Sequence, residues 1–189
     1  MLISGYHAIE SILIERPELI LKLFLSRSED KRGVKIKSLA NSSQINFEIL
    51  DSKKIDQTAG HSKHQGFLAE ISNPGFLSEK DIIPRLKNLN TSRVLILDSI
   101  QDPRNLGACL RNALAFEFDA VIINKDGSSP INEYVFKTSV GAILNLDIFY
   151  VTNLSRSINS LKDIGFWILG LDGNGEGSIF SEKFSSKTA

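Results

Sequence analysis

Residues 93–111, RVLILDSIQDPRNLGACLR, place polar and conformationally restricted side chains directly after an apolar run. The run has the composition of a buried strand, and the residues from Asn105 onward have the apolar spacing of a helix. In parallel α/β sheets, ligands bind beyond the carboxyl ends of the strands, and this stretch lies at such an end. It therefore indicates both the class of fold and the place of a site.

The side chains of this stretch suit a phosphate or a ribose. A proline restricts the loop, Asn105 is expected to cap the helix, and Gly107 allows another backbone or a ligand to approach closely. Arg111 lies six residues after Asn105, between one and two helical turns, so we expect it to reach back toward the loop. An amide and a guanidinium are suitable partners for phosphate and ribose oxygens. The structural alternative is a capped helix with Arg111 paired to Asp98 or Asp102.

Strand and helix patterns alternate through the second half of the chain. The expected strands are 93–98, 119–124, 146–151 and 166–172, and the expected helices are 105–116, 130–139 and 153–165. Strands that are separated by crossover helices predict a parallel sheet with helices on both faces. The fold class of this half is therefore α/β.

The first half of the chain predicts a smaller α/β unit. Its expected helices are 4–16 (capped by Ser4), 34–43 and 51–60, and its expected strands are 21–26, 45–50 and 64–72. The sequence Asn-Pro-Gly at 73–75 is then a strong turn signal. We expect a first domain at 1–74, a linker at 75–92 that includes a short helix, and a second domain at 93–189.

The composition is that of an ordinary packed protein without a strong charge. The 189 residues are 42% hydrophobic, and 22 Lys and Arg balance 22 Asp and Glu. A nucleic-acid partner would therefore have to bind a local basic patch, for which residues 31–37, KRGVKIK, are the best candidate. The alternative for this patch is a solvated helix start.

Cysteine usage and the lack of targeting signals favour a soluble cytoplasmic protein. Cys109 is the only cysteine, so no disulfide can form within the chain, which fits a reducing compartment. The sequence contains neither a signal peptide nor an apolar run of membrane-spanning length. His61 and His64 lack carboxylate or thiol companions nearby in the sequence, so we expect no metal site.

Several segments resemble one known family. DPRNLGACLRNALAF (102–116) resembles the first signature motif of the SpoU/TrmH group of RNA ribose methyltransferases, in the SPOUT superfamily. KTSVGAILNLDIFYVTNL (137–154) and GFWILGLDG (165–173) resemble its following segments. SGYHAIESIL (4–13) and KHQGF (63–67) resemble the N-terminal domain of the subgroup that methylates a guanosine ribose in large-subunit ribosomal RNA. The resemblance implies a small α/β RNA-binding domain, ribosomal-protein-like in fold, followed by a parallel-sheet SPOUT methyltransferase domain.

The resemblance also implies transfer of a methyl group from S-adenosylmethionine to a ribose 2′-hydroxyl of RNA. In the family, the arginine that matches Arg111 has the activating role, and Asn105 supports it. Because a guanidinium is nearly always protonated, we expect Arg111 to stabilise the developing alkoxide and to orient the ribose and phosphate. The expected cofactor contacts are Leu171, Asp172 and Gly173.

Further partners follow from the same resemblance. RNA contacts are expected at basic and imidazole side chains of the N-terminal domain and of the first motif, namely Lys31, Arg32, Lys63, His64 and Arg104. Phosphate contacts of this kind would make the affinity fall with salt concentration. The full-length family forms homodimers, and neither a metal nor a membrane takes part.

Some elements of the family have no counterpart in the sequence. The resemblance leads us to look for a strand, a Gly-x-Glu-Gly-x-Gly-like loop and an Ile-Pro-Met segment, which form the C-terminal knot and hold most of the methyl donor. None is found, so we expect the SPOUT domain to lack its knotted portion and the chain to be incomplete and inactive alone. GNGEGS at 173–178 is interpreted as a connecting loop. Glu117 stands where the family usually has glycine, so we expect strain there if φ is positive.

Two other functions fit parts of the sequence. A non-catalytic RNA-binding module derived from the same family would keep the RNA contacts without methyl transfer. An unrelated nucleotide-binding α/β protein is disfavoured, because neither a GxGxxG nor a Walker-type loop follows the first strand of the second half.

Overall fold

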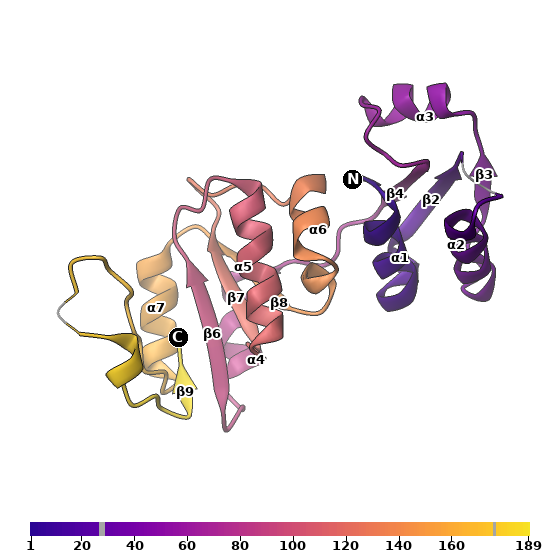
Figure 1. Cartoon of the computed structure of the whole chain (residues 1–189). Coiled ribbons are helices and arrows are strands. Elements are labelled where there is room, and N and C mark those ends of the chain that lie inside the picture. Colours follow the sequence, from indigo (N-terminus) through magenta and orange to yellow (C-terminus); the bar gives the residue numbers. More distant parts are fainter. Residues whose placement is uncertain (27–28, 176) are drawn as a thin grey trace. The chain divides into compact units, whose positions relative to one another are not determined.

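The chain divides into two compact units in the computed structural model, which describes residues 1–26, 29–175 and 177–189 (Figure 1). The first unit comprises residues 1–75, 102–111 and 130–145, and the second comprises 76–101, 112–129 and 146–189. The first unit therefore contains segments of both domains that the sequence predicts. We describe each unit by itself.

A four-stranded mixed sheet forms the centre of the first unit. Its order is β1 (Leu2–Ser4), β4 (Phe67–Ile71), β2 (Ile20–Leu25) and β3 (Phe47–Ile49). Strand β4 is antiparallel to both of its neighbours, and β2 and β3 are parallel. The surrounding helices are α1 (Tyr6–Glu15), η1 (Pro17–Leu19), α2 (Lys31–Ser42) and α3 (Ser52–Ala59). Ile3, Ile9 and Phe67 are fully buried in this core.

The ends of the helices follow from local chemistry. The side chain of Asp51 caps α3 by accepting a hydrogen bond from the Lys54 N–H (2.9 Å), as predicted. Gly60 ends the same helix with a φ of 74°, also as predicted. The helix expected to begin at Ser4 begins instead after Gly5, whose φ of 99° favours glycine. Ser4 belongs to β1.

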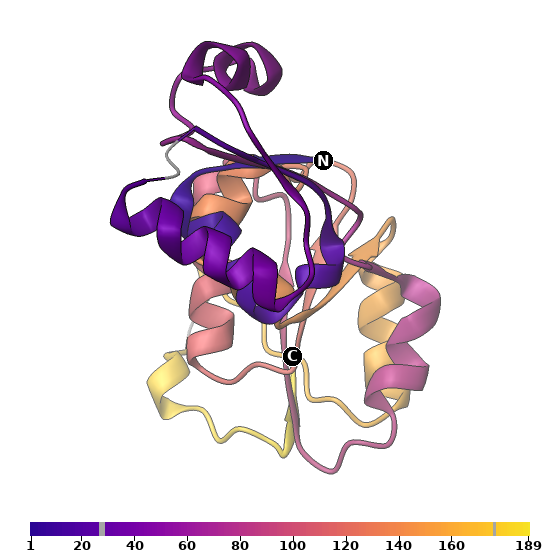
Figure 2. The ribbon, with the colours of Figure 1, turned by 90° about the vertical axis from the view of Figure 1, so that its right-hand side faces the viewer.

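A five-stranded, wholly parallel sheet forms the second unit, which confirms the predicted α/β fold. Its order is β5 (Leu77–Ser78), β8 (Asp147–Val151), β7 (Ala120–Asn124), β6 (Ser92–Leu97) and β9 (Lys187–Thr188). Helices α4 (Ile82–Leu86) and α7 (Leu154–Asp163) lie side by side (Figure 2). Ile82 and Leu161 of these helices share an apolar core with Phe149 of the sheet.

Two segments differ from the sequence-based expectation. Residues 75–92, expected to be a linker, contain β5, η2 (Glu79–Asp81) and α4, which all belong to the second unit. The strand expected at 166–172 is reduced to an isolated bridge between Trp167 and Thr188. The strand with which it pairs, β9, has only two residues. Residues 179–181 form a short helix, η4 (Ile179–Ser181).

The remaining helices are α5 (Pro103–Ala115), α6 (Glu133–Ser139) and η3 (Ala142–Leu144). Within the described ranges, no helix is both long and apolar enough to cross a membrane.

Candidate active site and RNA-binding loop

Helix α5 presents Asn105 and Arg111, the two residues that the sequence analysis assigns to catalysis. The capping residue is Asp102 rather than Asn105. Its carboxylate accepts a hydrogen bond from the Arg104 N–H (2.7 Å), and its carbonyl accepts one from the Leu106 N–H (3.0 Å). Asn105 therefore lies inside the first turn, is exposed, and makes no side-chain hydrogen bond to any described residue. Its amide is available to a ligand.

Arg111 is also available to a ligand. Its side chain is exposed, and the described part of the chain provides neither an ion pair nor a hydrogen bond for its guanidinium. The carboxylate of Asp98 instead accepts a hydrogen bond from the Ser99 hydroxyl (2.9 Å). The structural alternative, in which Arg111 pairs with Asp98 or Asp102, is not found. Because an α-helix rises about 1.5 Å per residue, Asn105 and Arg111 lie roughly 9 Å apart along the helix axis.

Gly107 brings α5 into direct contact with α6. A Cβ atom built at Gly107 would lie 2.7 Å from Cβ of Thr138, 3.0 Å from the carbonyl oxygen of Val135 and 3.1 Å from the amide nitrogen of Ser139. Only glycine fits at such distances, so the close backbone approach predicted for Gly107 is confirmed. Helix α6 thereby fixes the position of the helix that carries the candidate catalytic residues.

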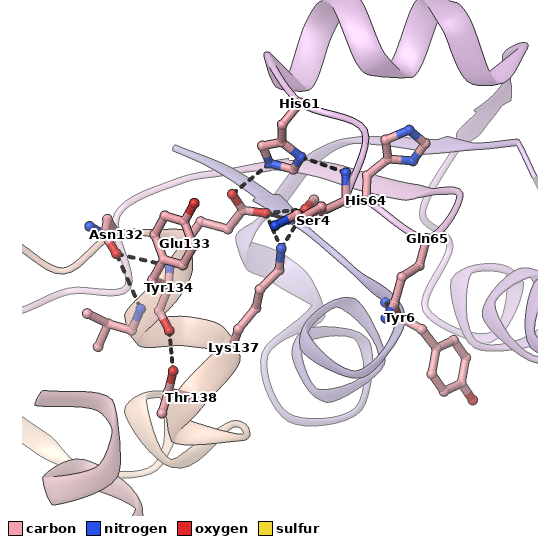
Figure 3. Close-up of polar contacts among 12 residues, drawn as sticks. Ser4, Tyr6, His61, His64, Gln65, Asn132, Glu133, Tyr134, Lys137 and Thr138 are labelled. Carbon is pink, nitrogen blue, oxygen red and sulfur yellow. Dashed lines mark hydrogen bonds and ion pairs between the residues drawn. The ribbon is translucent and has the colours of Figure 1, made fainter. Parts of the chain in front are cut away.

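A polar cluster holds the first turn of α6 (Figure 3). The Oε1 atom of Glu133 accepts hydrogen bonds from the amide N–H (3.0 Å) and the hydroxyl of Ser4. The ammonium group of Lys137 lies 2.8 Å from the same oxygen and donates to the Ser4 hydroxyl oxygen (3.0 Å). The Nε2 atom of His61 lies 3.0 Å from Oε2 of Glu133. Both carboxylate oxygens of Glu133 are thus occupied by donors.

The surroundings of Glu133 favour its ionised form. Burial acts to raise the pKa of the carboxyl group, but the hydrogen bonds from Lys137, Ser4 and His61 outweigh it and hold the pKa below the usual value. The carboxylate therefore stays charged at neutral pH and remains an acceptor for all three groups.

Two histidine side chains, His61 and His64, hold the backbone of the loop of residues 61–66 by hydrogen bonds. The Nδ1 atom of His61 accepts the Lys63 N–H (3.2 Å), and Nδ1 of His64 accepts the Gly66 N–H (2.9 Å). Each ring therefore carries its proton on Nε2, which faces a carboxylate: Glu133 for His61, and Asp56 (2.8 Å) for His64. His64 is only 2% exposed. It presents no free nitrogen to RNA, in contrast to the expectation from the sequence.

The other residues expected to contact RNA are exposed. Lys31 and Arg32 start α2, and the guanidinium of Arg32 lies 5.1 Å from the centre of the Tyr6 ring, a cation–π geometry. Lys63 lies in the loop of residues 61–66, and Arg104 lies in the first turn of α5.

The expected cofactor residues form an exposed turn of the second unit. Leu171 is 75% exposed, and a side chain built at Gly173 would meet no atom within 4 Å. The carboxylate of Asp172 accepts the Asn174 N–H (2.8 Å), and its carbonyl accepts the Gly175 N–H (3.0 Å). The GNGEGS segment is thus a turn where it is described, and Glu176 lies outside the described residues. A carboxylate on an exposed turn can accept hydrogen bonds from the hydroxyl and amino groups of a ligand.

Two further properties of the site concern metals and the single thiol. Across the described ranges, no group of three or more His, Cys, Asp or Glu residues is placed to hold a metal ion. Cys109 is half-buried in α5, and burial raises the pKa of its thiol.

Sequence reasoning missed the polar cluster around Glu133. Ser4 was expected to be a helix cap, and His61 was considered only as a metal ligand. Glu133 directly follows Asn132, whose side chain caps α6 by accepting the Tyr134 N–H (2.9 Å). That capping pattern could have located the helix start, but the link from Glu133 to Ser4 spans 129 residues and cannot be found locally.

Both halves of the chain match models of known families. Residues 92–189 match the SpoU rRNA Methylase family, and residues 2–77 match the family for RNA 2′-O ribose methyltransferase substrate binding. The fold and these matches define an RNA 2′-O-ribose methyltransferase with a substrate-binding domain. The chain belongs to the SpoU rRNA methylase family, which confirms the family and the enzyme class expected from the sequence.

Similar proteins agree with this assignment. The 23S rRNA (guanosine-2′-O-)-methyltransferase RlmB of Shewanella oneidensis is 34% identical over 95% of this chain and 73% of its own. RlmB of Escherichia coli strain K12 is 31% identical over 100% of this chain and 78% of its own. An AdoMet-bound rRNA methyltransferase from Sinorhizobium meliloti has a TM-score of 0.75 at 16% identity, over 99% of this chain and 67% of its own. This last likeness supports the fold.

Proposed function

We propose that this chain transfers a methyl group from S-adenosylmethionine to the ribose 2′-hydroxyl of a guanosine in large-subunit ribosomal RNA. The observation that carries the proposal is the pair Asn105 and Arg111, which lie exposed and free of protein partners in the described structure, on the helix of the family's first motif. Relatives at 31% and 34% identity are named 23S rRNA (guanosine-2′-O-)-methyltransferases, which supports guanosine as the target.

In the proposed mechanism, Arg111 stabilises negative charge on the substrate. A ribose hydroxyl is a weak nucleophile and must lose its proton to solvent or to a base as its oxygen forms the new bond to carbon. The fixed positive charge of Arg111 lowers the energy of the developing alkoxide, and the amide of Asn105 orients the ribose. S-adenosylmethionine supplies a methyl group on a positively charged sulfur, which leaves as a neutral thioether. Leu171, Asp172 and Gly173 would hold it.

RNA would bind through exposed basic side chains. Residues 1–74 serve as the substrate-binding domain in this proposal, with Lys31, Arg32 and Lys63 as phosphate contacts. Arg104, one residue before Asn105, would hold a phosphate beside the reacting ribose. Phosphate contacts fix the position of a nucleic acid without reading its sequence, so the choice of nucleotide must come from other contacts.

The homodimer and the cytoplasmic location also remain proposals. Exposed apolar side chains of the second unit, including Trp167 at 58% and Phe180 at 97%, support an interface there. Sedimentation equilibrium over a range of protein concentrations tests the dimer, and a concentration-independent monomer mass would contradict it. A ribosomal RNA substrate would place the reaction in the cytoplasm.

A methylation assay tests the proposed function. The protein is incubated with a 23S rRNA transcript and methyl-labelled S-adenosylmethionine, and the RNA is digested to nucleosides. Label in 2′-O-methylguanosine that Arg111→Ala abolishes would support the proposed function and would contradict the expectation from the sequence that the chain is inactive alone. Label in another nucleoside would contradict the guanosine assignment. RNA binding without any transfer would favour the non-catalytic RNA-binding module.

A further inference from the structure

We propose that Glu133 is a positioning residue that fastens the RNA-binding loop 61–66 to the helix that carries Asn105 and Arg111. This inference rests on the proposed function, because it concerns how the RNA-binding loop is held in a fixed position relative to the helix that carries Asn105 and Arg111. All of the contacts that carry it lie within the first unit.

The first step is the contact between Glu133 and the loop. His61 is the intermediary, because its Nδ1 atom accepts the Lys63 N–H (3.2 Å) and its Nε2 atom faces the Glu133 carboxylate (3.0 Å). One imidazole ring therefore joins the backbone at Lys63 to the first turn of α6. The carboxylate fixes the tautomer and the orientation of the ring, as in other histidine–carboxylate pairs. Lys63, the exposed cation of the loop, is held by this arrangement.

The second step is the contact between Glu133 and the start of the chain. The Ser4 N–H donates to Glu133 (3.0 Å), and Lys137 lies one helical turn further along α6, where it bonds both Glu133 and Ser4. A Cβ atom at Gly5 would lie 3.4 Å from Cε of Lys137, so glycine leaves room for this side chain. Charge-assisted hydrogen bonds of this kind are stronger than neutral ones. Strand β1 and the loop are thus held by the same carboxylate.

The third step runs from α6 to α5. Thr138 and Val135, on the same short helix as Glu133, press against Gly107 with no space for a methyl group. Gly107 lies between Asn105 and Arg111 on α5. Catalytic groups need placement to within fractions of an ångström, which supporting contacts provide. Glu133 therefore supports the candidate catalytic residues through α6. In this proposal, Glu133 itself does not contact the substrate.

Amide hydrogen exchange tests the fastening without any RNA. Glu133→Gln keeps the shape of the side chain but removes the charge and replaces one acceptor by a donor facing His61. We expect the Ser4 and Lys63 amides to exchange at least about tenfold faster in this variant, since each loses its link to a charged acceptor. Unchanged exchange at both amides would overturn the proposal.

A matched control separates positioning from general stability. Glu79 is as buried as Glu133 (18% against 17% of the side chain exposed) and pairs with Arg156, but both of these residues lie in the second unit. We expect Glu79→Gln to lower the melting temperature while leaving the exchange of Ser4 and Lys63 as in the wild type. Equal acceleration of these amides by both variants would mean a global effect and would overturn a specific role for Glu133.

Binding and turnover test the link to function. With the 23S rRNA transcript, we expect Glu133→Gln to lower kcat by at least about tenfold while Kd rises less, because the RNA contacts themselves are kept. Wild-type kcat in a variant with accelerated exchange would overturn the coupling. If the wild type itself neither binds nor methylates the transcript, the proposed function is wrong. The exchange data then still show whether Glu133 fastens the loop to α6.

A second variant guards against loss of folding. His61→Ala removes only the loop side of the cluster and leaves the contact between Ser4 and Glu133. We expect faster exchange at Lys63 with little change at Ser4. If Glu133→Gln lacks a cooperative melting transition, this variant carries the test, and unchanged exchange at Lys63 would overturn the proposal.

Discussion

Gly107 lies so close to α6 that a Cβ atom at this position would be 2.7 Å from Cβ of Thr138. The neighbouring atoms include a backbone carbonyl and a backbone amide, which cannot move aside as the tip of a flexible side chain can. The contact therefore sets the distance between α5 and α6 with little tolerance. Any side chain at residue 107 must push α5 and α6 apart.

Gly107→Ala is expected to destabilise the protein by about 1–3 kcal/mol, the usual range for overpacking a tight contact. Urea unfolding curves recorded by circular dichroism measure the change in the free energy of unfolding. Gly170→Ala is the matched control, because a Cβ there meets no atom within 4 Å. Equal stabilities of the two variants would contradict the close approach.

Arg111→Lys should reduce kcat of the proposed methyl transfer by at least about a hundredfold while leaving stability unchanged. Lysine keeps the charge but loses the planar fork of donors, and oxyanion-type contacts of this kind contribute factors of this size. Because the guanidinium is exposed and unpaired within the described structure, its loss breaks no internal contact. Arg85→Lys, an exposed arginine of α4, serves as the control. A variant with wild-type turnover would remove Arg111 from the mechanism.

Stability should depend on pH through Glu133. Its pKa in the folded protein is lower than the ordinary value of 4.5, so its contribution is fully present above about pH 4.5 and is lost as the pH falls through the folded pKa. We expect the stability difference between wild type and Glu133→Gln to be largest near pH 7 and to shrink toward pH 3. Urea midpoints at several pH values measure it, and a difference that grows on acidification would have the wrong sign.

Glu117→Gly should stabilise the protein. Glu117 follows α5 with a φ of 57°, a conformation in which a non-glycine residue is strained by about 1–2 kcal/mol. Glycine removes this strain but is more flexible in the unfolded chain, so the expected net gain is about 0.5–1 kcal/mol. The melting temperature measures the gain. Glu48→Gly, in strand β3 without a positive φ, should lower the melting temperature instead.

Lys31→Gln and Lys63→Gln should each make RNA binding less sensitive to salt. One phosphate contact contributes about 0.7–0.9 to the slope of log affinity against log salt concentration, so each variant should lose that amount. Filter binding to the 23S rRNA transcript between low and moderate salt measures the slope. Lys162→Gln, in α7 of the second unit, should leave it unchanged. A slope that is the same in all four proteins would exclude Lys31 and Lys63 as phosphate contacts.

Much of the fold follows from local pattern. The parallel sheet of the second unit was predictable because strands such as β7 are continuous apolar runs between helical segments. Caps such as Asp51 and the stop at Gly60 were predictable because they depend on neighbours within a few residues. For Glu117, the resemblance to a family that usually has glycine there predicted strain if φ is positive, and its φ is 57°.

The rest depends on contacts between distant residues. Asn105 was expected to cap α5, but Asp102 caps it instead, which places Asn105 within the first turn of the helix. His64 was expected to touch RNA, but its side chain is buried and pairs with Asp56, which lies on a different element, α3. The pairing of Glu133 with Ser4 joins segments with no periodic relationship in the sequence. Such long-range polar contacts leave no signal in local spacing.

Cys109 gives the protein a built-in chemical reporter. It is the only cysteine, and it lies on α5 between Asn105 and Arg111. Because burial raises the pKa of its thiol, little of the nucleophilic thiolate exists at neutral pH, and alkylating reagents should react slowly with the folded chain. Any event that loosens α5 would expose the sulfur and speed its alkylation. A single labelling rate, measured by mass spectrometry without an introduced probe, can therefore follow the mobility of the helix.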